Sequence, residues 1–179
     1  MSKTMEKPKD MLCGPACIFY LSKMFQIDVK IPNDFIWITD IASFIETNLG
    51  HTVTLSCHNS TLWNDYCKIG QQSDFPFEGF QKLHDYLQNP SHHIFEQELS
   101  PQKITELLRE GKVLLLNVSS ALFHNDATLS GGHYILVIEA SKEGYLVVNP
   151  GSELIHVSYY PKEKIVSSCT QFGSWMLMI

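Results

Sequence analysis

The sequence predicts an α+β fold, in which helices dominate the first third of the chain and strands dominate the last third. Apolar residues recur at helical spacing from about Cys13 to Phe25, which favours a helix with one buried face. Lys112–Val118 is a continuous apolar run, as expected for a central strand covered on both faces. Tyr134–Ala140 and Gly144–Val148 flank a short polar turn and predict a β-hairpin. This order is typical of an N-terminal helical part packed on a C-terminal antiparallel sheet.

Turn and capping signals predict the remaining elements. Residues 1–10 are interpreted as a polar lead-in, and Gly50 ends a second helix that begins near Asp40. Ser100-Pro101 supplies the N-cap and the first position of another helix, which ends at Gly111. We also expect strands at His51–Ser56, Ile94–Leu99, Ile155–Tyr159 and Trp175–Ile179, helices at Pro76–Leu87 and Pro161–Ser168, and a loop-rich region over 59–75.

Length and composition limit the class of protein. The 179 residues show no internal repeat, low-complexity tract or linker, so we expect one domain over residues 1–179. The formal charge of −6 is spread without long runs of either sign and argues against a nucleic-acid partner. No apolar window is long enough to span a bilayer, so no membrane partner is expected.

The N-terminal residues and the cysteines favour a cytoplasmic protein. The first nine residues are polar and contain no apolar core of a signal peptide, although export by a leaderless route would look the same. The five cysteines are odd in number and their spacing suggests no disulfide framework. We therefore expect a protein that folds in a reducing compartment; its oligomeric state stays open.

Cys13-Gly14-Pro15 is a candidate nucleophile motif. Pro15 fits the first turn of a helix, where its missing N–H costs nothing, and Gly14 allows close approach to the backbone. Cys13 then lies at a helix N-terminus, where the macrodipole favours negative charge and hence the nucleophilic thiolate. The alternative is a small core cysteine on an amphipathic helix.

Two polar residues at the open end of the predicted hairpin favour the catalytic interpretation. His133 begins the first strand and Asn149 ends the second, and an antiparallel hairpin brings such ends together. An asparagine side chain that binds one ring nitrogen fixes the tautomer of a histidine and leaves the other nitrogen to face a thiol. Cys13, His133 and Asn149 therefore match the parts of a Cys-His-Asn hydrolase.

These blocks resemble a known family. Leu12–Cys17, Gly132-His133-Tyr134 and Asn149-Pro150 are similar to papain-like cysteine peptidases of the bacteriocin-processing, C39-like kind. Ile36–Ala42 and the tail 169–179 resemble a related group named after a guanylyl cyclase domain. The resemblance covers most of the chain and implies a papain-like fold, with Cys13 as nucleophile, His133 as base and Asn149 as orienting residue.

The chain departs from the family pattern at two positions. The family usually carries an acidic residue directly before its cysteine, where this chain has Leu12. It also places a glutamine six positions upstream to hydrogen-bond the oxyanion, and this chain has Lys7 there. We expect Lys7 to lie beside the Cys13 thiol and to take over oxyanion stabilisation. A repurposed or inactive site is the alternative.

Other residues offer weaker alternatives. Cys17, one helical turn after Cys13, is a rival nucleophile, but inside the helix it loses the N-terminal field. His124 and Asp126 precede His133 and could line the cleft, but we interpret their segment as a solvated loop. The set Cys57, His58, Cys67 and His92-His93 could be read as metal ligands, but its spacing matches no zinc pattern. We expect no metal and no cofactor.

The sequence thus predicts a thiol hydrolase that cleaves peptide or isopeptide bonds of a peptide or protein substrate through an acyl-enzyme. An acyl transferase would use the same triad with an amine in place of water. Nucleotide cyclisation is suggested only by the name of the similar group, since the chain shows no glycine-rich phosphate loop. A catalytically inactive binding module is the non-enzymatic alternative, and Lys7 is its best support.

Overall fold

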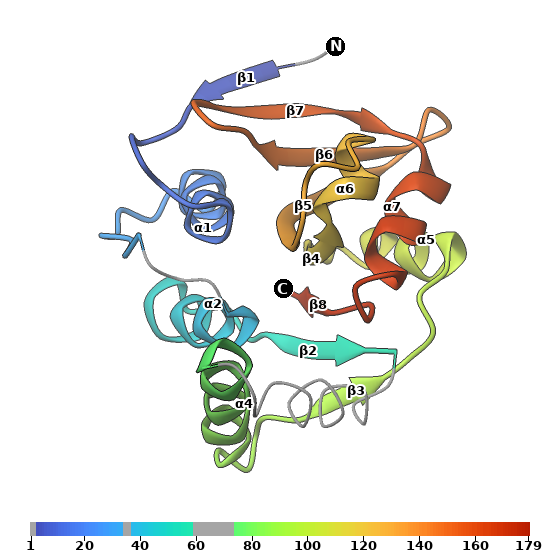
Figure 1. Ribbon diagram of the computed structural model, residues 1–179. Coiled ribbons are helices and arrows are strands. Elements are labelled where there is room, and N and C mark those ends of the chain that lie inside the picture. The colour runs from blue at the N-terminus through green and yellow to red at the C-terminus, as the bar shows by residue number, and fades with distance from the viewer. Residues whose placement is uncertain (1–2, 34–36, 59–73) are drawn as a thin grey trace.

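The computed structural model describes residues 3–33, 37–58 and 74–179 (Figure 1). The strands are β1 (Lys3–Glu6), β2 (Thr54–Cys57), β3 (Ile94–Glu96), β4 (Leu114–Ser119), β5 (Gly132–Ala140), β6 (Tyr145–Pro150), β7 (Leu154–Tyr160) and β8 (Met176–Met178). The helices are α1 (Cys13–Met24), α2 (Ile38–Phe44) with its π-helical extension η1 (Ile45–Leu49), α4 (Asp74–Leu87), α5 (Pro101–Arg109), α6 (Ser120–His124) and α7 (Lys162–Thr170). Helices α1 and α2 follow one another in the N-terminal part, and strands β5, β6 and β7 follow one another in the C-terminal part.

Within the described residues, the eight strands form one sheet in the order β1-β7-β6-β5-β4-β8-β2-β3. β5 and β6 form the predicted hairpin, and β4 pairs antiparallel with β5 on one side and with β8 on the other. Helices α1, α2 and α4 lie on one side of the sheet, and α5, α6 and α7 lie on the other (Figure 1). The architecture is therefore a mixed arrangement of helices on a sheet, as the α+β prediction requires.

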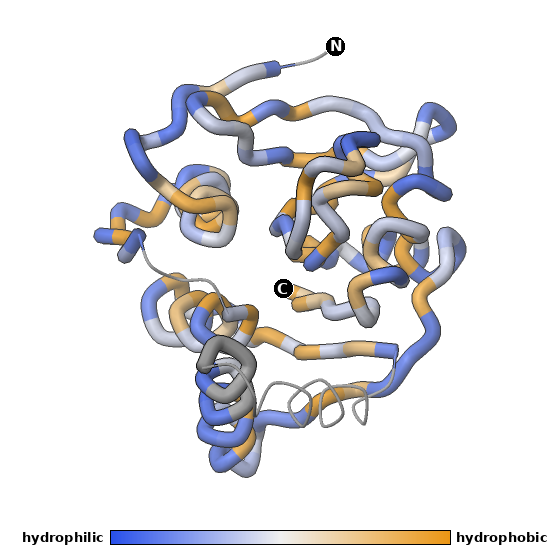
Figure 2. The backbone as a smooth tube through the Cα atoms, in the orientation of Figure 1, coloured by the Kyte–Doolittle hydropathy of each residue, from blue (hydrophilic) through white to orange (hydrophobic). Residues whose placement is uncertain are grey.

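Two hydrophobic cores lie on opposite faces of this sheet. Leu115 of β4 belongs to the core under α1 and α2, whereas Leu114 and Leu116 belong to the core under α5, α6 and α7. Apolar segments accordingly run through the middle of the fold, and polar segments gather at its outside (Figure 2). The continuous apolar run of β4 is thus explained by burial on both faces, as predicted.

Local capping rules account for several element boundaries. Ser100 caps α5, because its side-chain oxygen accepts a hydrogen bond from the Lys103 N–H at 3.1 Å. Gly50 follows η1 with a left-handed φ of 70°, a conformation that glycine adopts without strain.

None of the helices in the described part of the chain is long and apolar enough to cross a membrane.

The sheet departs from the sequence prediction in two respects. Residues 3–6, which we expected to be part of a lead-in, form β1 and pair antiparallel with β7 at the edge of the sheet. β2 and β3 pair parallel rather than antiparallel, and the long connection between them contains α4, as a parallel crossover requires. β1 therefore forms one edge of the sheet and β3 forms the other. The loop-rich prediction for 59–75 falls mostly on residues outside the described ranges.

The β5–β6 turn provides a test of the fold. Gly144 has a φ of 140°, and a Cβ there would collide with the carbonyl oxygen of Tyr160. Gly50 also has a positive φ, but a Cβ there meets nothing within 4 Å. We expect Gly144→Ala to lower the free energy of unfolding by about 3 kcal/mol and the matched Gly50→Ala by about 1 kcal/mol, as measured by urea denaturation. Equal losses would contradict this packing of the hairpin against Tyr160.

Candidate active site

His133 and Asn149 are in direct contact at one end of the β5–β6 hairpin. The ladder register pairs Leu136 with Val148, so His133 and Asn149 are diagonal neighbours on the same face of the sheet. The His133 Nε2 atom lies 2.8 Å from the Asn149 Oδ1 atom, and both side chains are buried. The predicted proximity of these two residues is confirmed.

This hydrogen bond determines which ring nitrogen of His133 carries the proton. An amide oxygen can only accept, so Nε2 must donate to Asn149 Oδ1. In the neutral ring Nδ1 is then unprotonated and available as a base. The Asn149 amide is consistent with this orientation, because its Nδ2 atom donates to the Tyr160 hydroxyl at 3.3 Å.

The surroundings of His133 strongly favour its neutral form. Burial is the main cause that lowers the pKa of His133 from 6.5 to about 4, and the positive charges of His124 and Lys7 act in the same direction. The hydrogen bond with Asn149 opposes them and raises the pKa of His133. At neutral pH the ring is therefore an uncharged base.

An aromatic cluster covers the His133–Asn149 pair on the α6 and α7 side. The Phe123 ring is buried and lies 5.8 Å from the His133 ring and 5.1 Å from the Tyr160 ring, centroid to centroid. The His124 ring lies 5.1 Å from the His133 ring; His124 is exposed to solvent, as predicted, but it ends α6 rather than lying in a loop. Burial lowers the pKa of His124, and the nearby Lys164 charge adds to this effect. This cluster keeps the pair in a low-dielectric environment.

Cys13 begins α1, which packs against β5 and β6. The buried Cys17 thiol, one turn further along the helix, donates to the Tyr134 carbonyl oxygen at 3.5 Å and fixes α1 next to His133. Burial is the main cause that raises the pKa of Tyr134. Negative charge on Cys13 or Asp40 acts in the same direction, so both groups lie near the Tyr134 hydroxyl. Within the described residues no hydrogen bond joins Cys13 Sγ to His133, a bond that in many enzymes forms only when substrate binds.

Lys7 lies next to the start of α1, and its charge also acts on His133. Its backbone N–H donates to the Glu153 carbonyl oxygen at 3.1 Å, which continues the pairing of the N-terminal strand with β7. The Lys7 Nζ atom donates to the carbonyl oxygen of Met11, two residues before Cys13, at 2.6 Å. The Lys7 charge also contributes to the lowered pKa of His133, after burial and the His124 charge.

The rival nucleophile and the metal alternative gain no support from the geometry. Cys17 is fully buried, and burial raises its pKa well above the ordinary value for a thiol. Cys13, in contrast, is partly exposed. No group of three or more histidine, cysteine, aspartate or glutamate side chains in the described residues is arranged to hold a metal ion. Cys67 of the candidate metal set lies outside the described residues.

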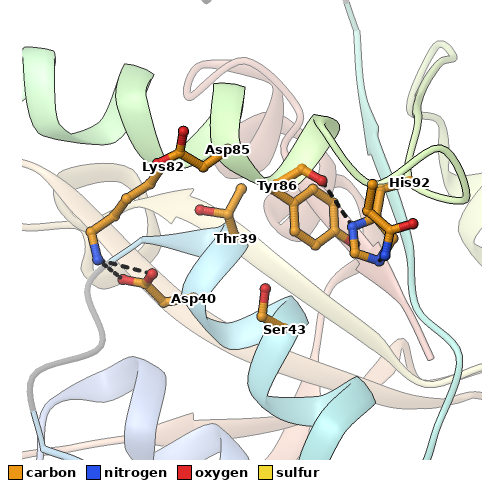
Figure 3. Close-up of a pocket in the computed structure, with 8 residues that line it drawn as sticks. Thr39, Asp40, Ser43, Lys82, Asp85, Tyr86 and His92 are labelled. Carbon is orange, nitrogen blue, oxygen red and sulfur yellow. Dashed lines mark hydrogen bonds and ion pairs between the residues drawn. The ribbon is translucent and has the colours of Figure 1, made fainter.

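A second polar site occupies the space between α2 and α4, where a pocket of about 360 Å³ opens (Figure 3). Lys82 of α4 binds both carboxylate oxygens of Asp40 on α2, at 2.9 and 2.8 Å. The His92 ring stacks on Tyr86 at 3.9 Å, and its Nδ1 atom lies 2.9 Å from the Tyr86 carbonyl oxygen. The Lys82–Asp40 contact joins the two helices, the His92–Tyr86 contact fixes the turn after α4, and we assign both a structural role. The pocket is lined by Thr39, Asp40, Ser43, Lys82, Asp85, Tyr86, Asn89 and His92.

Phe123 and Tyr160, which surround the pair, were not predicted from the sequence, whereas His124 was named as a residue that could line the cleft. Phe123 and His124 belong to α6, a helix of five residues that is too short to produce a periodic pattern. Its one local signal is Ser119, whose side chain caps the helix by accepting from the Leu122 N–H at 3.5 Å. Tyr160 lies opposite Tyr145 in the ladder, so register alone does not place it beside Asn149.

The lowered pKa of His133 makes stability depend on pH. The unfolded chain binds a proton at this ring below about pH 6.5, whereas the folded protein does so only near pH 4. Stability from the neutral ring is therefore complete above pH 6.5 and is lost as the pH falls towards 4. Between pH 7.5 and 5 we expect wild type to lose about 2 kcal/mol more than His133→Gln, which cannot titrate, as measured by urea denaturation. Parallel losses in the two proteins would refute a buried neutral His133.

Comparison with known proteins assigns neither a family nor a function to this chain. No family model, no curated protein and no solved structure matches the chain. A functional proposal therefore rests on the chemistry of the residues themselves: a partly exposed thiol at a helix N-terminus, a neutral imidazole with Nδ1 unprotonated, and an amide bound to its Nε2.

Proposed function

We propose that this protein is a papain-like cysteine hydrolase that cleaves peptide or isopeptide bonds through Cys13, His133 and Asn149. The observation that carries the proposal is the hydrogen bond between His133 Nε2 and Asn149 Oδ1, which leaves Nδ1 as a free base. The packing of α1 against β5 supports the assignment of Cys13 as nucleophile, since it brings the start of the helix to the strand that carries His133.

The reaction follows from these roles. His133 Nδ1 takes the proton of the Cys13 thiol as Sγ attacks the carbonyl carbon of the substrate. The tetrahedral intermediate collapses by breaking the carbon–nitrogen bond, and the imidazolium gives its proton to the leaving amine. Water, deprotonated by the same nitrogen, then hydrolyses the thioester and restores the thiol. A ring that is neutral at rest is suited to accept the first proton.

Lys7 is our candidate for stabilising the oxyanion in place of the family's glutamine. Its ammonium group has three donors, and one of them is used on the Met11 carbonyl oxygen. The other two remain for solvent or for an oxygen that becomes negative in the transition state. The effect of its charge on His133 supports a place for Lys7 within reach of the reacting atoms.

A proteome-derived peptide mixture, analysed by mass spectrometry for new termini, tests the activity across many candidate substrates at once. Wild type should generate a reproducible set of cleaved peptides. Cys13→Ala and His133→Ala should abolish it, and Asn149→Ala should slow cleavage by about a hundredfold or more while leaving the fold intact. Cys17→Ala is the matched control and should keep activity. Wild-type cleavage by His133→Ala would refute the mechanism. An added amine that captures the acyl group would identify the transferase alternative.

Two substitutions at position 7 test the proposed oxyanion donor. Lys7→Ala should slow cleavage by about tenfold or more, because a charged donor near the developing oxyanion is lost. Lys7→Gln should retain or raise the rate, because an amide restores a neutral donor of suitable length. Lys9→Ala, which removes an exposed lysine from the same segment, is the control. Equal rates for all four proteins would show that the oxyanion donor lies elsewhere.

A further inference from the structure

The His92 ring, in the turn after α4, has a partner at each of its two nitrogens. Nδ1 lies 2.9 Å from the carbonyl oxygen of Tyr86, and Nε2 lies 3.0 Å from the Oε2 atom of Glu46 on η1. Only 16% of the His92 side chain is exposed, and the ring stacks on that of Tyr86 (Figure 3). The contact with Glu46 therefore ties the end of α4 to η1.

Both of these partners are hydrogen-bond acceptors. A backbone carbonyl oxygen and an ionised carboxylate only accept, so the ring can bind both at once only when Nδ1 and Nε2 each carry a proton. That form is the imidazolium ion, and its bond with Glu46 is charge-assisted. In the neutral ring the Tyr86 carbonyl oxygen retains the one proton on Nδ1, and the lone pair of Nε2 then faces the Glu46 carboxylate, which repels it.

Asn89 offers the neutral ring a different partner for Nε2. Its Nδ2 atom lies 3.5 Å from His92 Nε2. The Ser91 backbone N–H, which can only donate, binds Asn89 Oδ1 at 3.1 Å, so Nδ2 is the amide atom turned towards His92. An amide N–H can donate to a lone pair on Nε2 but makes no bond with a protonated Nε2. Glu46 thus suits the charged ring, and Asn89 suits the neutral ring.

We propose that His92 is a pH-dependent switch that joins α4 to η1 when its ring is charged and releases η1 when its ring is neutral. In the charged state Nε2 donates to Glu46. On loss of one proton to solvent, Nε2 accepts from Asn89 instead, a residue of its own turn. The switch is independent of the proposed hydrolase activity.

The other titratable and charged groups near His92 are Glu46, Tyr86, His93 and the pocket residues Asp40, Lys82 and Asp85. Burial raises the pKa of Tyr86, and the Glu46 charge adds to this effect, so the phenol keeps its proton. The His93 ring contacts Phe95 instead. Carboxylates and ammonium groups ordinarily titrate outside the range from pH 5.5 to 8.5. The Asp40–Lys82 pair therefore holds α4 to α2 throughout this range, and His92 controls only the end of α4.

A double-mutant cycle on unfolding tests the switch. His92→Phe keeps an aromatic ring against Tyr86 but has no nitrogen, and Glu46→Gln removes the carboxylate at nearly constant size. Urea denaturation of wild type, both single variants and the double variant gives the coupling between the two side chains, and contributions common to all four proteins cancel. We expect a coupling of about fivefold or more in the folding equilibrium constant at pH 5.5, and of less than about twofold at pH 8.5.

His84 and Asp85 provide a matched control on α4. His84 Nδ1 lies 3.5 Å from Asp85 Oδ1, but the two side chains are 57% and 63% exposed, so water competes for the contact. The cycle of His84→Phe and Asp85→Asn should show no coupling at either pH. Absence of coupling between His92 and Glu46 at pH 5.5, or equal coupling at pH 5.5 and 8.5, would overturn the proposal.

The ¹⁵N chemical shifts of the His92 ring in wild type give a second measurement that needs no variant. At pH 5.5 both nitrogens should be protonated. At pH 8.5 the ring should be neutral with its proton on Nδ1, held by the Tyr86 carbonyl oxygen, and with Nε2 unprotonated towards Asn89. A ring protonated on Nε2 at pH 8.5, whether neutral or charged, would refute the exchange of partners.

Discussion

The hydrogen bond between His133 and Asn149 is the constraint on which the candidate site depends. It joins two buried polar groups that would each be costly to bury alone, and it assigns the single ring proton to Nε2. The β5–β6 hairpin supplies the two strands at the required register, and the contact of α1 with β5 brings the helix that begins with Cys13 to the same strand. The fold thus brings the helix that begins with Cys13 and the His133–Asn149 pair to the same strand, and the described residues contain no group arranged to hold a metal ion.

Electrostatics around this bond favour a base that is uncharged at rest. Burial lowers the pKa of His133 most strongly, and the positive charges of His124 and Lys7 act in the same direction. His133 is therefore a neutral imidazole before substrate arrives. In the proposed mechanism this ring takes up a proton as Cys13 attacks the substrate, and the Lys7 charge meets the oxyanion as it develops.

Sequence reasoning predicted what local pattern and motif encode, and missed what only three-dimensional packing decides. The hairpin and its two polar ends followed from strand alternation and from the antiparallel rule, and the contact between His133 and Asn149 confirms that prediction. β1 was missed because a four-residue edge strand depends on a distant partner, β7. Tyr160 was missed because its side chain reaches along the strand to an amide four ladder positions away, a contact that no spacing rule expresses.

The central claim is that Cys13 and His133 act as one chemical unit, and an electrophilic peptide probe tests it most directly. Intact-mass and peptide-mapping mass spectrometry report how fast an adduct forms and which cysteine carries it. A nucleophile–base pair predicts one adduct, on Cys13, that forms much more slowly in His133→Ala while the other cysteines stay unmodified. An adduct on Cys17, or labelling of Cys13 at the same rate with and without His133, would contradict the claim.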